Sequence, residues 1–133
     1  GHLRVLNGGL LSTTNGWIGF AATSESSALI AGGGEWTLDT TVSIGTFGKA
    51  SLEISDGGVL RSQRSFVADG TTGRATVLIT GDDSAWVTAE NFLIGGQADG
   101  TLGGVGEVAL RDSGLLDVGG TLRVFDKSSL LLA

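Results

Sequence analysis

The residues best suited to chemistry in this sequence are two adjacent carboxylates, Asp82 and Asp83, within the run Gly81-Asp82-Asp83-Ser84. Neighbouring carboxylates flanked by backbone carbonyls supply the oxygen ligands that calcium prefers. Aspartate is also common at solvated turns, where its side chain bonds to the local backbone. The sequence therefore favours an exposed acidic turn, with a calcium site as the alternative, and it indicates no other metal and no cofactor.

Residues for catalysis are scarce. The 133 residues include one histidine, His2, and no cysteine, which excludes thiol catalysis, disulfides and zinc ribbons. Gly1-His2 is itself typical of a cloning remnant. Carboxylates that cleave polysaccharides work in pairs, and no outward strand face of the coils described below stacks two acids. The sequence therefore predicts no enzyme activity.

The chain is organised by a repeat of roughly 25 residues, a period typical of solenoids. Each repeat begins with two apolar residues spaced two apart, which point to the same face of a β-strand. The final pair lies at the end of the chain, inside a sixth repeat, so we expect the chain to be part of a longer array. The pairs are Leu3/Val5, Ala28/Ile30, Leu52/Ile54, Val77/Ile79, Val108/Leu110 and Leu130/Leu132.

Two further apolar positions follow in every repeat and predict two more inward-facing columns. The second column is Leu11, Trp36, Leu60, Trp86 and Leu116. The third is Ile18, Ile44, Ala68, Ile94 and Val124, four of which are preceded by Val42, Phe66, Phe92 and Leu122. Strands this short at this period must stack in parallel, coil on coil. The prediction is an all-β parallel β-helix with coils near 3–27, 28–49, 50–74, 75–106 and 107–128, and the start of a sixth at 129–133.

Glycine-rich corners separate the predicted strands. The first corner ends in Gly9, Gly34, Gly58 and Gly114, where we expect a positive φ. Gly19, Gly45 and Gly95 open the last corner, where Asp69 and Phe125 stand in the other coils. The longest corner segment, 96–106, is a protruding insertion and a natural place for recognition on a rigid scaffold.

Two exposed apolar surfaces are expected. Trp17, Val67 and Leu93 face outward on the third strands and indicate a partner-contact patch, unless segments 20–27 and 96–106 fold back over them. Residues Leu3, Val5, Leu130 and Leu132 lie at the two open ends of the stack, where end-to-end contacts between copies are expected.

Charge excludes some partners. The formal net charge is −6, and the basic residues are scattered singly, so nucleic acid is not an expected partner. No stretch approaches the roughly 20 apolar residues that a spanning helix needs, so no membrane insertion of this segment is expected. The expected partners are neighbouring repeats of the same polypeptide, further copies, and a host or matrix glycan or protein.

Three runs carry a family resemblance: 50–60 (ASLEISDGGVL), 75–86 (ATVLITGDDSAW) and 91–95 (NFLIG). They resemble the passenger repeats of bacterial autotransporters, which read strand, Gly-Gly turn, strand, Ile-Gly. Coils one, three and five carry a Gly-Gly-apolar version, and coils two and four carry a tryptophan version. The repeat is therefore a two-coil unit.

The resemblance implies a right-handed, single-stranded parallel β-helix of about five coils, exported to the cell surface. It also implies a separate C-terminal barrel in a Gram-negative outer membrane, and roles in adhesion, aggregation or display. The expected function is a non-catalytic structural or adhesive segment of a secreted or surface-anchored protein. The alternative is a carbohydrate-binding or carbohydrate-cleaving β-helix whose active groove lies outside these residues.

Overall fold

The computed structural model describes all 133 residues as β-strands and turns without any helix. The strands form three parallel sheets, ordered β1-β4-β7-β10-β13-β16, β2-β5-β8-β11-β14 and β3-β6-β9-β12-β15. The first sheet comprises β1 (His2–Val5), β4 (Glu25–Ile30), β7 (Lys49–Ser55), β10 (Arg74–Thr80), β13 (Val105–Arg111) and β16 (Ser129–Leu132).

The other two sheets contain shorter strands. The second comprises β2 (Leu10–Thr13), β5 (Glu35–Leu38), β8 (Val59–Ser62), β11 (Ala85–Thr88) and β14 (Leu115–Val118). The third comprises β3 (Gly16–Ile18), β6 (Thr41–Ile44), β9 (Arg64–Val67), β12 (Phe92–Ile94) and β15 (Leu122–Val124).

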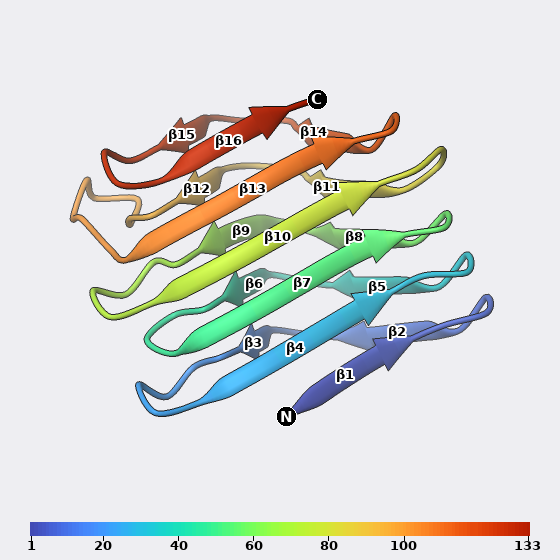
Figure 1. The fold of residues 1–133 in the computed structure, drawn as a ribbon, viewed down its shortest axis with the longest axis horizontal. Coiled ribbons are helices and arrows are strands. Elements are labelled where there is room, and N and C mark those ends of the chain that lie inside the picture. Colours follow the sequence, from blue (N-terminus) through green and yellow to red (C-terminus); the bar gives the residue numbers. More distant parts are fainter.

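The chain winds as a β-solenoid of about five coils, three strands to each coil. In Figure 1 it runs left to right along the first sheet, returns behind through the other two, and climbs one level per coil, which makes the solenoid right-handed. The predicted fold class is therefore confirmed. With about 4.8 Å between neighbouring strands, the distance from β1 to β16 across the first sheet is about 24 Å.

The register places equivalent side chains directly above one another. Trp36 pairs with Leu60, Leu60 with Trp86 and Trp86 with Leu116, as the second column predicts. The first-strand pairs also align, and most of the column residues lie in one continuous hydrophobic core. His2 belongs to β1, where its Nδ1 lies 2.5 Å from Ser27 Oγ.

The alternation of tryptophan and leucine has a packing cause. The first inward-facing position of the third strand is small in coils one and three (Gly16 and Ser65) and larger in coils two, four and five (Val42, Phe92 and Leu122). The Trp36 indole occupies the space where Gly16 lacks a side chain. Likewise Trp86 Nε1 donates to Ser65 Oγ at 2.9 Å. Each tryptophan therefore needs a small residue in the coil beneath it.

A buried hydroxyl cluster lies under Trp86. Ser65 Oγ is 2.6 Å from Ser62 Oγ and 2.7 Å from Thr88 Oγ1, and all three residues are buried. The equivalent Trp36 Nε1 donates to Thr13 Oγ1 at 2.9 Å. Each indole N–H is thus satisfied inside an apolar tube, where an unpaired polar group is costly.

The predicted third column is wrong in coil three, where the inward-facing residue is Val67 instead of Ala68. Val67, predicted to face outward, pairs with Ile44 and Ile94 and is fully buried. Phe66 faces outward instead, and Ala68 occupies the corner that Gly19, Gly45 and Gly95 occupy in other coils. The corner before β9 is one residue shorter than in coil two, and Ala68 adopts φ +56° to make the turn that was assigned to Asp69.

The predicted role of the first-corner glycines is also wrong. Positive φ falls on the two residues before the last glycine, such as Asp56 (48°) and Gly57 (76°). Gly58 itself lies against the carbonyl of Ile30 in the coil below, where a Cβ would collide with backbone. Close approach between coils, rather than backbone handedness, selects the final glycine. Gly34 and Gly114 face backbone carbonyls in the same way.

Candidate functional site

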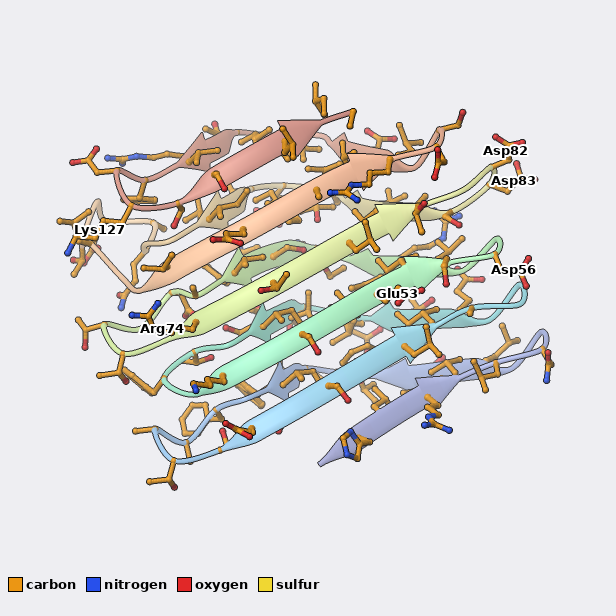
Figure 2. All side chains as sticks on the ribbon, viewed as in Figure 1. Glu53, Asp56, Arg74, Asp82, Asp83 and Lys127 are labelled. Carbon is orange, nitrogen blue, oxygen red and sulfur yellow. The ribbon has the colours of Figure 1, made fainter.

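The adjacent carboxylates Asp82 and Asp83 lie at the tip of an exposed turn, directed away from the sheets (Figure 2). The turn closes through the Ser84 N–H, which donates to Gly81 O at 3.2 Å, and Asp83 adopts φ +63°. No cluster of three or more histidine, cysteine or acidic side chains is arranged to hold a metal ion. The structure thus brings no third carboxylate or histidine to this pair.

The predicted contact patch of Trp17, Val67 and Leu93 does not form. Trp17 is exposed, with 53% of its surface accessible, but Val67 is fully buried in the core and Leu93 is 4% exposed. The one-residue displacement in coil three removes Val67 from the outer face and puts Phe66 in the same outward column as Leu93. A different apolar surface therefore replaces the predicted one.

Aromatic residues outside the core gather at the corner that follows the third strand of each coil, which we call the third corner. Of three Trp and five Phe residues, Trp36, Trp86 and Phe92 are in the core. The rest lie on the outer face of the third sheet or at this corner. The aromatic surface consists of Trp17, Phe20, Phe47 and Phe66; the fifth residue, Phe125, is buried beneath Arg123.

Three of the four rings of the aromatic surface contact one another edge to face. The centroids of Trp17 and Phe20 are 6.1 Å apart, and those of Phe20 and Phe47 are 5.9 Å apart, with interplanar angles of 77° and 80°. Phe20 is 55% exposed and Phe47 is 38% exposed. The Phe47 ring lies on the backbone of Gly70, where a Cβ would come within 2.5 Å of it. Water therefore contacts a row of rings in fixed positions.

A cavity of about 420 Å³ adjoins this row, and Phe47 belongs to both. Its lining comes from three successive third corners and mixes rings, carboxylates and an amide. The lining residues are Thr46, Phe47, Phe66, Asp69, Gly70, Gln97, Ala98 and Asp99. The sequence indicated recognition by segment 96–106, and the structure places the start of that segment in this wall.

The Asp69 carboxylate is held by a buried hydroxyl group of the coil below. Ser43 Oγ, 2% exposed, lies 2.5 Å from Asp69 Oδ1 and 2.8 Å from Thr46 Oγ1. Gln97 Nε2 donates to the Asp69 carbonyl at 3.4 Å. One carboxylate oxygen is thus fixed by a buried hydroxyl, which orients the group at the cavity.

Asp99 lies at the outer end of the cavity, in a turn that is fully exposed. The Thr101 side chain and the Thr101 N–H, which donates to Asp99 Oδ1 at 2.9 Å, lower the pKa of Asp99 below its usual value. A hydrogen bond to the charged form favours ionisation. Asp99 is therefore a carboxylate at neutral pH.

Basic groups lie beside the same corner but outside the aromatic cavity. Arg74 and Lys127 line a second cavity of about 180 Å³. Figure 2 shows them at one end of the first sheet, with Asp56, Asp82 and Asp83 at the opposite end. The only ion pairs join Lys49 to Glu25, Arg61 to Glu35 and Arg64 to Glu90.

The residues predicted for end-to-end contact lie on the edge strands of the first sheet. Leu3 and Val5 are on β1, and Leu130 and Leu132 are on β16. Val5 is 6% exposed, whereas Leu132 is 70% exposed. Edge strands present unpaired backbone groups, so both edges have the polarity needed to pair with another parallel strand.

Comparison with known protein families, curated proteins and solved structures finds no match to this chain. None of its elements is a helix with the length and hydrophobicity to cross a membrane.

Proposed function

We propose that this chain is a non-catalytic structural and adhesive segment of a secreted or surface-anchored bacterial protein, comparable to an autotransporter passenger stalk. The observation that carries the proposal is the unbroken register of the first sheet. Each inward column continues through every coil, from Val5 to Leu132, without a slip. A stack of this kind forms an elongated and rigid rod because backbone hydrogen bonds join each coil to the next.

The backbone hydrogen bonds support this role. The structure contains 88 of them, and those outside the strands also run mostly between successive coils. Side chains add to the same linkage, since Trp36 bonds to Thr13, Ser43 to Asp69 and Trp86 to Ser65 between successive coils. Solenoid stability is a sum of such contacts between neighbours, so added coils lengthen the structure without changing its cross-section. Export to the cell surface rests on the resemblance of the repeats.

A tandem protein tests the proposal. Because Leu132 occupies the column of Val5, a second copy joined so that Asn7 follows Ala133 keeps the register. We expect one continuous rod that is longer by five coil steps, or about 24 Å, in small-angle X-ray scattering. Two compact bodies joined by a flexible link would contradict the role as a shaft.

Two further measurements address partners and location. Sedimentation of the single chain at high concentration should reveal end-to-end association, which Leu132→Glu should weaken by placing a charge at the edge. Antibodies against the chain should label intact cells of the source organism, and external protease should remove that labelling. Signal that appears only after lysis would contradict surface display.

A further inference from the structure

We propose that the aromatic surface and its adjoining cavity form a binding site for a neutral oligosaccharide built from pyranose rings. The site extends over the third corners of coils one to four and is distinct from the core that gives the solenoid its stiffness. The inference goes beyond the proposed structural role and does not depend on it.

The first argument is the cost of exposing these rings. Trp17 and Phe20 each leave more than half of their surface accessible, although the solenoid has an apolar interior that holds other aromatics. Exposed apolar surface grouped in one place marks an interaction site. Pyranose rings present a flat face of C–H groups that packs on an aromatic ring, so a sugar removes this surface from water.

The second argument is the polar half of the site. Ligand pockets combine apolar walls with a few well-placed polar groups. Here Asp69, Asp99 and Gln97 provide hydrogen-bond acceptors and one amide donor beside the rings of Phe47 and Phe66. Hydroxyl groups are the donors that match such acceptors, and bonds to a carboxylate are stronger than neutral ones. A purely apolar partner would remove both carboxylates from water without supplying a hydrogen-bond donor to their remaining acceptor sites.

The third argument is charge. The cavity lining contains two carboxylates and no lysine or arginine, and the whole chain carries a net charge of −6. Uronic acids, sulfated sugars, phosphates and nucleic acids would be repelled there. The ligand is therefore not an anion, and the hydroxyl groups of a neutral sugar are donors that match these carboxylates.

The fourth argument is preorganisation. Phe47 is fixed against Gly70 and pairs with Phe20, while Ser43 fixes the Asp69 carboxylate. A ligand therefore meets groups that need little ordering, which lowers the entropic cost of binding. Because the rings follow one another along the coil stack, the site favours an extended chain of sugars over a single sugar.

The test uses tryptophan fluorescence and calorimetry on the intact chain. Trp36 and Trp86 are buried, so Trp17 is the one exposed reporter. The probes are four neutral hexasaccharides, cellohexaose, laminarihexaose, chitohexaose and mannohexaose, with hexagalacturonate as the acidic counterpart. We expect at least one neutral probe to bind with Kd of about 1 mM or tighter and to shift the Trp17 emission, and hexagalacturonate not to bind.

Variants separate the parts of the site. Phe47→Ala and Trp17→Ala should each weaken binding about fivefold or more, as expected for the loss of a stacked ring. Asp69→Asn should weaken it while keeping the bond from Ser43. The matched control is Leu10→Ala, since Leu10 is 78% exposed on β2, in the second sheet, and does not line this cavity. Melting curves confirm that each variant is folded.

Three results would overturn the inference. The first is that none of the four neutral probes binds. The second is that Phe47→Ala and Asp69→Asn both bind as well as the wild type does. The third is that the wild type forms dimers and that Trp17→Ala abolishes this dimerisation. The last result would identify the surface as a contact between protein copies. None of them affects the tandem-length test, so failure of the sugar site and failure of the shaft are distinguishable.

Discussion

The indole of Trp36 lies directly against Gly16 of the coil below, in the space that a side chain at position 16 would fill. A Cβ there would also come within 2.7 Å of Trp36 Cη2 and 2.9 Å of Leu38 Cδ2. The same relation recurs two coils higher between Trp86 and Ser65. The two-coil repeat in the sequence is therefore a packing rule in which a large indole sits over a small residue.

Gly16→Ala should destabilise the protein by about 1–3 kcal/mol, because the new methyl group forces the Trp36 ring out of its place. Urea unfolding measures the loss. In a Trp36→Leu background, which copies Leu60 and Leu116 of the same column, Gly16→Ala should cost less. Equal costs in the two backgrounds would contradict the packing rule.

Ser65→Ala should cost about 1–3 kcal/mol, since it leaves the buried Trp86 N–H without its acceptor and removes a partner from Ser62 and Thr88. Ser51→Ala is the matched control, because Ser51 is exposed on β7. Thermal unfolding compares the two. If both variants melt alike, the buried hydroxyl cluster does not stabilise the fold.

Gly106→Ala should destabilise the fifth coil, because its Cβ would lie 2.9 Å from Ile94 Cγ2 and 3.0 Å from Val67 Cγ1. A Cβ at the corner residue Gly45 would lie 2.8 Å from the Ala75 Cβ, and the register makes Ala68 and Gly106 the equivalents of Gly45 and Ala75 one coil higher.

Ala68→Gly should therefore rescue Gly106→Ala, since the double variant copies the Gly45 and Ala75 pair and removes the positive φ from an alanine. A double-mutant cycle in urea measures the coupling free energy. Additive effects would mean that the two positions do not share one space.

Acid should loosen the turn that contains Asp99. Its pKa is lowered by hydrogen bonds from Thr101, so the stabilisation is present above the ordinary aspartate pKa and disappears as the pH falls through the lower folded value. Carboxyl NMR titration should show Asp99 protonating below ordinary aspartates, and Thr101→Val should raise its pKa. A normal titration in the wild type would exclude these bonds in solution.

The apolar spacing was sufficient to predict the fold class and most of the interior. Pairs of apolar residues spaced two apart, such as Val77 and Ile79, face the core. They do so because successive side chains of a strand point to opposite faces of the sheet, so residues two apart share one face. The sequence pattern also placed Asp82 and Asp83 in an exposed turn.

The place of Phe66 in the aromatic surface could not be predicted because it depends on a single residue of register. Coil three accepts either Val67 or Ala68 as its inward residue on hydrophobicity alone. The corner before β9 is one residue shorter than in coil two, which puts Val67 in register with Ile44 and Ile94 and turns Phe66 outward. The shared position of Asp69 and Asp99 in one cavity could not be predicted either, because corners of unequal length obscure which corner residues are neighbours in successive coils.

The most direct test of the stacked architecture is a distance ladder along the first sheet. His2, Ser27 and Ser129 occupy one outward row, with one coil step from His2 to Ser27 and four more to Ser129. The chain lacks cysteine, so pairs of spin labels can be attached at these positions without background. Pulsed electron resonance should give backbone separations of about 19 Å for 27–129 and about 24 Å for 2–129. Equal distances for the two pairs, or separations well beyond these values, would contradict the coil-on-coil stack.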